Sequence, residues 1–207
     1  DSVGAIARGK NGIVVGDPKQ MPPTSFFGAN IDAGDPDEED LESILDQALA
    51  ARLPHRRLMG HYRSRHETLI TFSNHKYYEN SLVTYPSSDT KVSAVTLRRV
   101  QGVYAKGQGR NNPIEARELV EEVIARLTDP QRQQQSLGIV TLNTEQQRTI
   151  EDLLDDARRK HPEIEPCFQA TDDYDPVFVK NLESVQGDER DVILFSLGYG
   201  PTVPGGT

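Results

Sequence analysis

The sequence predicts an α/β fold in which a mostly parallel sheet is flanked by helices. Short apolar runs rich in β-branched residues alternate along the chain with longer amphipathic segments, and turn-forming residues bound the runs. Such alternation implies parallel strands joined by helical crossovers. With 207 residues and 35% hydrophobic content, the chain is long enough for one full α/β domain and a smaller attached piece.

The first apolar run, residues 12–16, predicts a buried parallel strand. Asp17 and Pro18 follow it and signal a turn, at the end of a strand where α/β domains bind ligands. The next apolar residues predict an amphipathic helix, because they recur at helical spacing after acidic residues and stop before Pro54. They are Leu41, Ile44, Leu45, Ala48 and Leu49.

The following segments continue the alternation of helix and strand. A helix is expected over residues 66–77, with Leu69, Ile70 and Phe72 available for packing, and the alternation over 94–100 predicts a strand. Asn112, Pro113 and Glu115 then predict a helix start with an N-cap, a proline at the first position and a glutamate in capping-box register. The core stripe of this helix is Leu119, Val120, Val123, Ile124 and Leu127.

The last third of the chain has the most regular pattern. Strands are expected at residues 137–142, 177–180 and 191–196, and a helix at 144–160. The residues of that helix expected in the core are Ile150, Leu153, Leu154 and Ala157.

Composition limits the class of protein. A net charge of −9 argues against a protein that only coats nucleic acid. The chain can still have one basic surface, because many of the acidic residues lie within 35–46 and several arginines lie within 56–65. Cys167 is the single cysteine, so no internal disulfide can form. No stretch of the sequence has the pattern of a charged start, an apolar run and a cleavage site, and no apolar run has the roughly 20 residues that span a membrane. We expect a soluble, intracellular (cytoplasmic) protein with no membrane partner.

Three segments carry residues suited to chemistry. Residues 15–23 place Gln20 on a proline-stiffened loop after a strand, and residues 61–64 join an aromatic to an arginine in the order His-Tyr-Arg-Ser. Residues 182–196 place Gln-Gly-Asp-Glu in a loop before a strand, where a glycine permits close approach to a ligand. Taken singly, the first is also compatible with an ordinary turn and the second with surface packing.

Together and in this order, the three segments resemble motifs III, IV and V of superfamily-one helicases. Motif III there is Gly-Asp-x-x-Gln-x-x-Pro, motif IV contains Tyr-Arg, and motif V contains Gln-Gly-x-Glu-x-Asp. Residues 61–82 are most similar to the branch containing the RNA-decay and immunoglobulin-switch-region helicases. Residues 138–146 also resemble that branch's Ile-x-Thr-Pro-Tyr-x-x-Gln block, but Leu142 and Asn143 replace its Pro and Tyr. This difference weakens the expectation that the block contacts a strand of nucleic acid.

The resemblance implies a RecA-like fold and roles in ATP hydrolysis. In this family ATP lies between two RecA-like units, and the second presents an arginine to the γ-phosphate. Gln20 would sense the γ-phosphate or its attacking water, and Arg63 would be the arginine finger. Tyr62 would stack near the adenine, while Gly187 would let Glu189 contact the ribose or relay to the nucleic-acid site. The alternative for Glu189 is a surface ion pair with Arg190 or Lys180.

A single strand of DNA or RNA is the partner that the resemblance implies. It would cross the carboxyl ends of the second sheet, where Thr141, Asn143 and Ser184 could bond phosphates without reading bases. Hydroxyls at helix starts, such as that of Thr144, are more often caps.

Several parts of such a motor are missing from the sequence. It contains no Gly-x-x-x-x-Gly-Lys-[Ser/Thr] loop, no metal-holding Asp-Glu before motif III and no motif VI. We therefore expect an excised piece: residues 1–35 are the tail of a first RecA-like domain, 36–200 the second such domain and 201–207 a flexible end. ATP and Mg²⁺ would be cofactors of the parent protein and would not bind tightly here. No metal ligand is expected, and the missing first RecA-like domain is an expected partner.

Two function classes remain open at this point. The first is part of an ATP-dependent helicase or translocase, inactive as an isolated chain. The second is a catalytically inactive helicase-like module that binds a partner or nucleic acid, which the charge of −9 and the missing P-loop favour for the isolated chain. A small-molecule-binding domain has little support because no Gly-x-Gly-x-x-Gly follows a strand.

Overall fold

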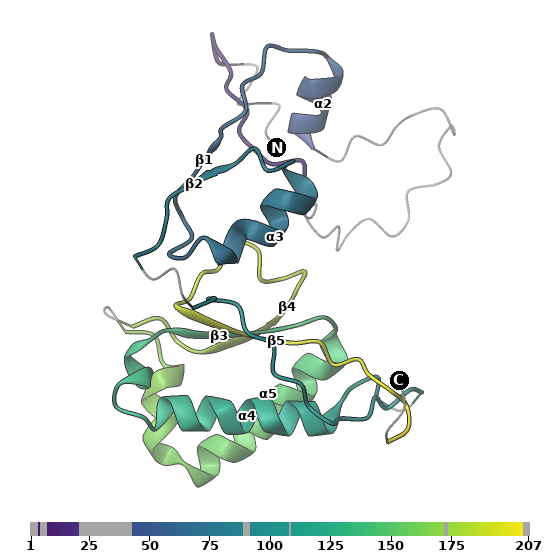
Figure 1. The fold of residues 1–207 in the computed structure, drawn as a ribbon, viewed down its shortest axis with the longest axis vertical. Coiled ribbons are helices and arrows are strands. Elements are labelled where there is room, and N and C mark those ends of the chain that lie inside the picture. Colours follow the sequence, from purple (N-terminus) through teal and green to yellow (C-terminus); the bar gives the residue numbers. More distant parts are fainter. Residues whose placement is uncertain are drawn as a thin grey trace. The chain divides into compact units, whose positions relative to one another are not determined.

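The computed structural model of the chain divides into two compact units, residues 1–97 and 98–207. Figure 1 shows the helices and strands of each unit. The predicted domain boundary at residues 35 and 36 lies outside the described residues. The structure describes Gly4 and the ranges 8–20, 43–88, 92–107, 109–171 and 174–204.

The described part of the second unit, residues 98–207, is built on a parallel sheet. Its strands are β3 (Leu137–Thr141), β4 (Phe178–Asn181) and β5 (Val192–Ser196), and β3 pairs with both of the others. Helices α4 (Pro113–Leu127) and α5 (Thr144–Lys160) lie on the same side of this sheet (Figure 1). The predicted α/β fold with a parallel sheet flanked by helices is confirmed, and it is consistent with a RecA-like domain.

The core of this unit lies between the sheet and the two helices. Ile139 of β3 and Ile150 of α5 are both 0% exposed, and Ile164 of the 3₁₀ helix η2 (Pro162–Phe168) closes the core beside α5. The predicted stripe of α4 is buried at three positions and partly buried at the other two, and Ala116 joins it although the sequence analysis did not include it. The buried core residues on α4 are Ala116, Val120, Val123 and Leu127, and those on α5 are Ile150, Leu154 and Ala157.

The central strand β3 requires a glycine at position 138. A Cβ atom there would lie 2.5 Å from the ring of Phe178 and 2.9 Å from the side chain of Ile193, which face it from the two neighbouring strands. Both distances are shorter than van der Waals contact allows. Gly138 therefore lets the side chains of β4 and β5 close over β3, which is buried along its whole length.

The predicted capping box at the start of α4 forms only in part. The side-chain oxygen of Asn112 accepts a hydrogen bond from the amide of Glu115 at 3.2 Å, as expected for an N-cap. The backbone amide of Asn112 does not bond to the Glu115 carboxylate, because it donates to Oε1 of Gln146 at 2.8 Å, and only the side-chain amide of Asn112 reaches that carboxylate, at 3.5 Å. The carboxylate instead accepts from Ser196 and from the amide of Gly198. The reciprocal half of the box is thus replaced by contacts between α4, α5 and β5.

The first unit, residues 1–97, has short elements. Helices α2 (Ile44–Ala50) and α3 (Thr68–Tyr77) confirm two predicted helices, although Leu41 lies outside the described residues. A parallel pairing of β1 (Gly60–His61) with β2 (Val83–Thr84) was not predicted. None of the described side chains of this unit is buried.

Two predicted strands are not formed. Residues 12–16 and 94–100 belong to no helix or strand, and Ile13 of the first segment is 90% exposed. An extended segment becomes a strand only when a neighbouring edge accepts its backbone hydrogen bonds, and no described residue pairs with either segment as a strand. Of the α3 residues expected to be available for packing, Ile70 is partly buried, whereas Leu69 and Phe72 are exposed.

In the part of the chain that the structure describes, no helix is both long and apolar enough to cross a membrane.

Candidate functional site

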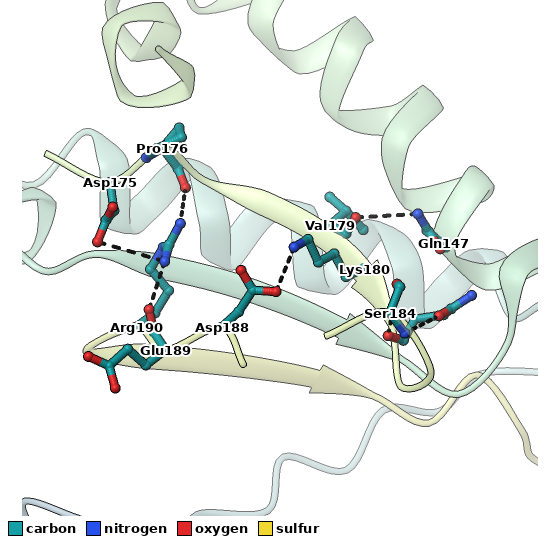
Figure 2. Close-up of polar contacts among 10 residues, drawn as sticks. Gln147, Asp175, Pro176, Val179, Lys180, Ser184, Asp188, Glu189 and Arg190 are labelled. Atoms are coloured by element: carbon teal, nitrogen blue, oxygen red, sulfur yellow. Dashed lines mark hydrogen bonds and ion pairs between the residues drawn. The ribbon is translucent and has the colours of Figure 1, made fainter. Parts of the chain in front are cut away.

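The loop between β4 and β5 begins with a turn held by Asn181. The side-chain oxygen of Asn181 accepts the amide of Ser184 at 2.9 Å, and its carbonyl accepts the Ser184 hydroxyl at 3.2 Å. The amide of Leu182 donates to the carbonyl of Thr141 at 2.8 Å, which ties this turn to the end of β3. Ser184 is therefore exposed at the carboxyl ends of the strands (Figure 2).

Arg190 fixes the other end of the same loop. Its guanidinium donates to the carbonyl of Pro176 at 3.1 Å and to the carbonyl of Glu189 at 2.7 Å, and it lies 4.8 Å from the centre of the Phe178 ring. Its side chain is only 10% exposed, and Asp175 lies 3.8 Å away as a counter-charge. The sequence analysis considered Arg190 only as a partner for the Glu189 carboxylate. An arginine just before a strand was the available signal for this structural role.

The carboxylate of Glu189 is exposed and forms no ion pair with any described residue. Both cations that could have paired with it are engaged elsewhere. Lys180 pairs with Asp188 at 2.5 Å, and Arg190 bonds the backbone carbonyls (Figure 2). The alternative of a surface pair for Glu189 is therefore wrong in this structure. Gly187, with φ of +92°, provides the left-handed turn that precedes it.

Thr141 and Asn143 lie at the end of β3 but bond inward. Thr141 is 0% exposed, and its hydroxyl donates to the carbonyl of Asn143 at 2.9 Å. The side-chain oxygen of Asn143 accepts the amide of Gln146 at 2.8 Å, so Asn143, not Thr144, is the N-cap of α5. A phosphate contact by Thr141 or Asn143 stays a prediction, and it would require these side chains to leave their present partners.

A buried polar network lies behind the same edge of the sheet. Gln146 is 0% exposed, and its amide donates to the Ser196 hydroxyl at 3.0 Å while its oxygen accepts the Asn112 amide. The Ser196 hydroxyl donates in turn to Glu115 at 2.6 Å. This network joins α4, α5 and β5, and it explains why a glutamine occurs on the inner face of α5. The sequence analysis named Gln146 only as part of a family block.

In the first unit, Tyr62 and Arg63 lie at the tip of a turn. The turn is closed by His61, whose Nε2 accepts the amide of Ser64 at 3.3 Å and lies 2.7 Å from its hydroxyl. Tyr62 is 81% exposed, and Arg63 is exposed without an ion pair to any described residue. The local fold thus presents an aromatic ring and a guanidinium outward.

Gln20 lies on the loop after residues 12–16, and Asp17 holds this loop. The Asp17 carboxylate accepts the amide of Lys19 at 3.0 Å, the side-chain amide of Gln20 at 3.3 Å and the hydroxyl of Tyr78 at 2.5 Å. Burial of the Tyr78 phenol, followed by its hydrogen bond to Asp17, raises the pKa of Tyr78 to about 12. Met21 to Pro23 of the motif lie outside the described residues.

The predicted site residues fall into separate groups. Thr141, Asn143 and Ser184 share the carboxyl edge of the second unit's sheet, whereas Glu189 lies toward the amino ends of the strands (Figure 2). The residues Gln20, Tyr62 and Arg63 belong to the first unit. No group of three or more potential metal ligands occurs among the described residues.

Comparison with known proteins bears on what this arrangement does. A family model described as an AAA domain matches residues 41–198, most of the chain. The chain belongs to this AAA domain family. The match includes β3, β4 and β5, the strands of the second unit's parallel sheet that Figure 1 labels.

Two relatives are each named an uncharacterized ATP-dependent helicase. The one from Mycoplasma pneumoniae is 34% identical over 212 residues and matches 96% of this chain. The one from Mycoplasma genitalium is 33% identical over 205 residues and matches 92% of this chain. The chain spans 18% of the length of each relative. The family and these relatives together support a helicase-like P-loop family for the chain.

Proposed function

We propose that the chain is part of an ATP-dependent helicase or translocase that moves along single-stranded nucleic acid. The AAA domain match and the names of the relatives support this at the level of the family. The order of the superfamily-one motifs III, IV and V supports the finer assignment. The chain then supplies the γ-phosphate sensor, the arginine finger and part of the strand groove, while ATP and Mg²⁺ bind through a first RecA-like domain of the longer protein.

The observation that carries the proposal is the exposed Tyr62–Arg63 turn. The guanidinium of Arg63 has no ion pair among the described residues, so no internal carboxylate competes with a phosphate for it. A planar guanidinium can bond two oxygens of a γ-phosphoryl group as charge builds in the transition state. The ring of Tyr62 beside it is exposed enough to stack on a base. In this proposal Arg63 is the arginine finger and Tyr62 the adenine-stacking residue.

Glu189 is available in the same way. With Lys180 paired to Asp188 and Arg190 bonded to carbonyls, the Glu189 carboxylate can accept hydrogen bonds from the hydroxyls of a ribose. The space at the Gly187 turn is open, since a Cβ built on Gly187 would meet nothing within 4 Å. Ser184 supplies an exposed hydroxyl to the proposed strand groove, whereas Thr141 and Asn143 would need to reorient.

The test is ATP turnover by a longer protein that contains this chain, with and without single-stranded nucleic acid. Arg63→Ala should lower turnover about 10³- to 10⁵-fold and leave strand affinity nearly unchanged, and Arg63→Lys should rescue little because an ammonium lacks the fork geometry. Arg56→Ala is the matched control, since Arg56 is exposed in the same unit and has no assigned role. Near-wild-type turnover of Arg63→Ala would remove the arginine-finger assignment.

The isolated chain offers a second test. It should hydrolyse no ATP above background and should bind single strands weakly with a steep dependence on salt. Tight strand binding that is insensitive to salt, with no turnover in the longer protein, would favour a helicase-like binding module.

A further inference from the structure

We infer that Asp17 and Tyr78 form a positioning pair that fixes the Gln20 loop on the end of helix α3. The inference rests on the proposed function, because it assigns the pair to the γ-phosphate sensor of that site. Both residues belong to the first unit, and they are separated by 61 residues in the sequence.

The geometry of the pair is specific. Tyr78 is the C-cap residue of α3, and its hydroxyl donates to Oδ2 of Asp17 at 2.5 Å. The guanidinium of Arg57 lies 5.9 Å from the centre of the Tyr78 ring. Both Asp17 and Tyr78 are partly buried in a unit in which most neighbouring side chains are exposed. The contact therefore has more shelter from water than its surroundings, which strengthens a hydrogen bond to a carboxylate.

The same carboxylate also organises the loop. Oδ1 of Asp17 accepts the amide of Lys19 at 3.0 Å, and Oδ2 accepts Nε2 of Gln20 at 3.3 Å. The backbone amide of Gln20 donates to the carbonyl of Asp17 at 3.2 Å. When Tyr78 fixes the carboxylate, it also fixes the turn from which Gln20 extends. Gln20 has to exchange its side-chain bond to Asp17 for the nucleotide, while the bond from Tyr78 keeps Asp17 in place.

The protonation state of Tyr78 is constant near neutral pH. The pKa of Tyr78 lies at about 12, since burial disfavours the phenolate and Asp17 accepts its proton-bearing hydroxyl. Tyr78 therefore stays a neutral donor near neutral pH. Removal of the hydroxyl, rather than a change of pH, is the suitable perturbation.

The experiment compares Tyr78→Phe with Tyr77→Phe in the longer protein. Tyr77 is the adjacent residue on α3, it is exposed, and its ring makes an edge contact with Phe72 at 6.4 Å that phenylalanine can keep. Tyr78→Phe should lower kcat for ATP about 10- to 100-fold, the equivalent of a lost hydrogen bond to a charged group, with KM within about twofold. Tyr77→Phe should leave both values unchanged.

A second measurement follows the loop itself. Hydrogen exchange of the amides in residues 12–20 should be faster in Tyr78→Phe than in Tyr77→Phe, for this chain and for the longer protein. Unchanged kcat, unchanged exchange, or a rise in KM that accounts for the loss would each overturn the positioning role. If the wild-type longer protein has no strand-stimulated turnover, the proposed function fails. Exchange in residues 12–20 then still shows whether Tyr78 fixes the loop.

Discussion

The two compact units are stabilised by different kinds of contact. In residues 98–207, apolar side chains from α4, α5 and β3 form a core in which Ile139 and Ile150 have no exposure to solvent. In residues 1–97, no described side chain is buried, and polar contacts such as that between Asp17 and Tyr78 join distant segments. The first unit nevertheless contains Gln20, Tyr62 and Arg63, the residues assigned to phosphate chemistry.

The difference shows where each unit obtains its stability. Burial of apolar area is the main favourable term in folding, so the second unit can hold its structure by itself. The first unit has apolar segments, including residues 12–16, but Ile13 and Val15 of that segment are 90% and 80% exposed. We expect its conformation to depend on whatever polypeptide or ligand packs against it. A site whose residues lie in such a unit would be completed by that contact.

The largest expected effect is in the core. Ile150→Ala removes a fully buried side chain between α5 and the sheet, and it should destabilise the second unit by about 2 to 5 kcal/mol. Ile13→Ala, in an exposed segment of the first unit, should change stability by less than about 0.5 kcal/mol. Urea unfolding, monitored by hydrogen exchange in each unit, measures the change in stability of both variants. Equal losses for the two variants would contradict the contrast between the units.

A smaller effect is expected in the buried polar network. Gln146→Ala leaves the buried backbone amide of Asn112 without its acceptor, and it removes one of the two hydrogen bonds of the Ser196 hydroxyl, which keeps its bond to Glu115. An unsatisfied buried group costs about 1 to 3 kcal/mol. The same unfolding measurement applies. Asp152→Ala is the control on the same helix α5, because Asp152 is exposed. Equal stability of the two variants would show that the network contributes nothing specific.

The helix caps allow a direct comparison of the units. Asn112→Ala removes the cap of α4 and should cost about 0.5 to 2 kcal/mol of the second unit's stability. Ser43→Ala removes the cap of α2, whose Oγ accepts the amide of Asp46 at 3.1 Å. Because no core holds α2, we expect only local loss of helix there. Circular dichroism and hydrogen exchange distinguish local loss of helix from global loss of stability. A global loss of stability in Ser43→Ala would show that α2 unfolds together with the rest of its unit, which contradicts the expectation.

The smallest expected effect is a loosening of the second unit by acid. Hydrogen bonds from the amides of Gln131 and Arg132 lower the pKa of Asp129, and the hydrogen bond from Arg158 lowers that of Glu165. Carboxylates with a lowered folded pKa stabilise the folded state above the unfolded values of about 4, and this contribution is lost as pH falls through the folded values. The urea concentration at the midpoint of unfolding should therefore decrease as the pH is lowered below about 4. Glu165→Gln should reduce this dependence.

The sequence predicted the second unit far better than the first. The limits of α5 and the stripe of α4 follow from apolar residues at helical spacing, and a buried core confirms that pattern. Residues 12–16 and 94–100 have strand-like patterns too, but a strand also needs a neighbouring edge, which local sequence cannot reveal. Local sequence likewise cannot show whether the Thr141 hydroxyl is available to a ligand, because this depends on the bond that it donates to the carbonyl of Asn143, the N-cap residue of α5.

For the site, residue types were easier to predict than their partners. The resemblance indicated Glu189 and Arg63, and both are exposed in the structure. It did not indicate that Asp188, rather than Glu189, would pair with Lys180, because that choice depends on the turn at Gly187. The contact of Tyr78 with Asp17 joins residues far apart in the sequence, and no local pattern predicts it.

The ring of Phe178 limits which residues can occupy position 138 of the sheet. It fills the space above Gly138, and the cations of Lys180 and Arg190 lie 5.3 Å and 4.8 Å from its centre. A larger residue at position 138 can be accommodated only if the side chain at 178 becomes smaller and that of Ile193 moves aside. Such an exchange would also remove the π face that both cations use, and with it one support of the loop that bears Glu189. Changes in the volumes of the β3 and β4 side chains thus affect the shape of the loop that follows β4.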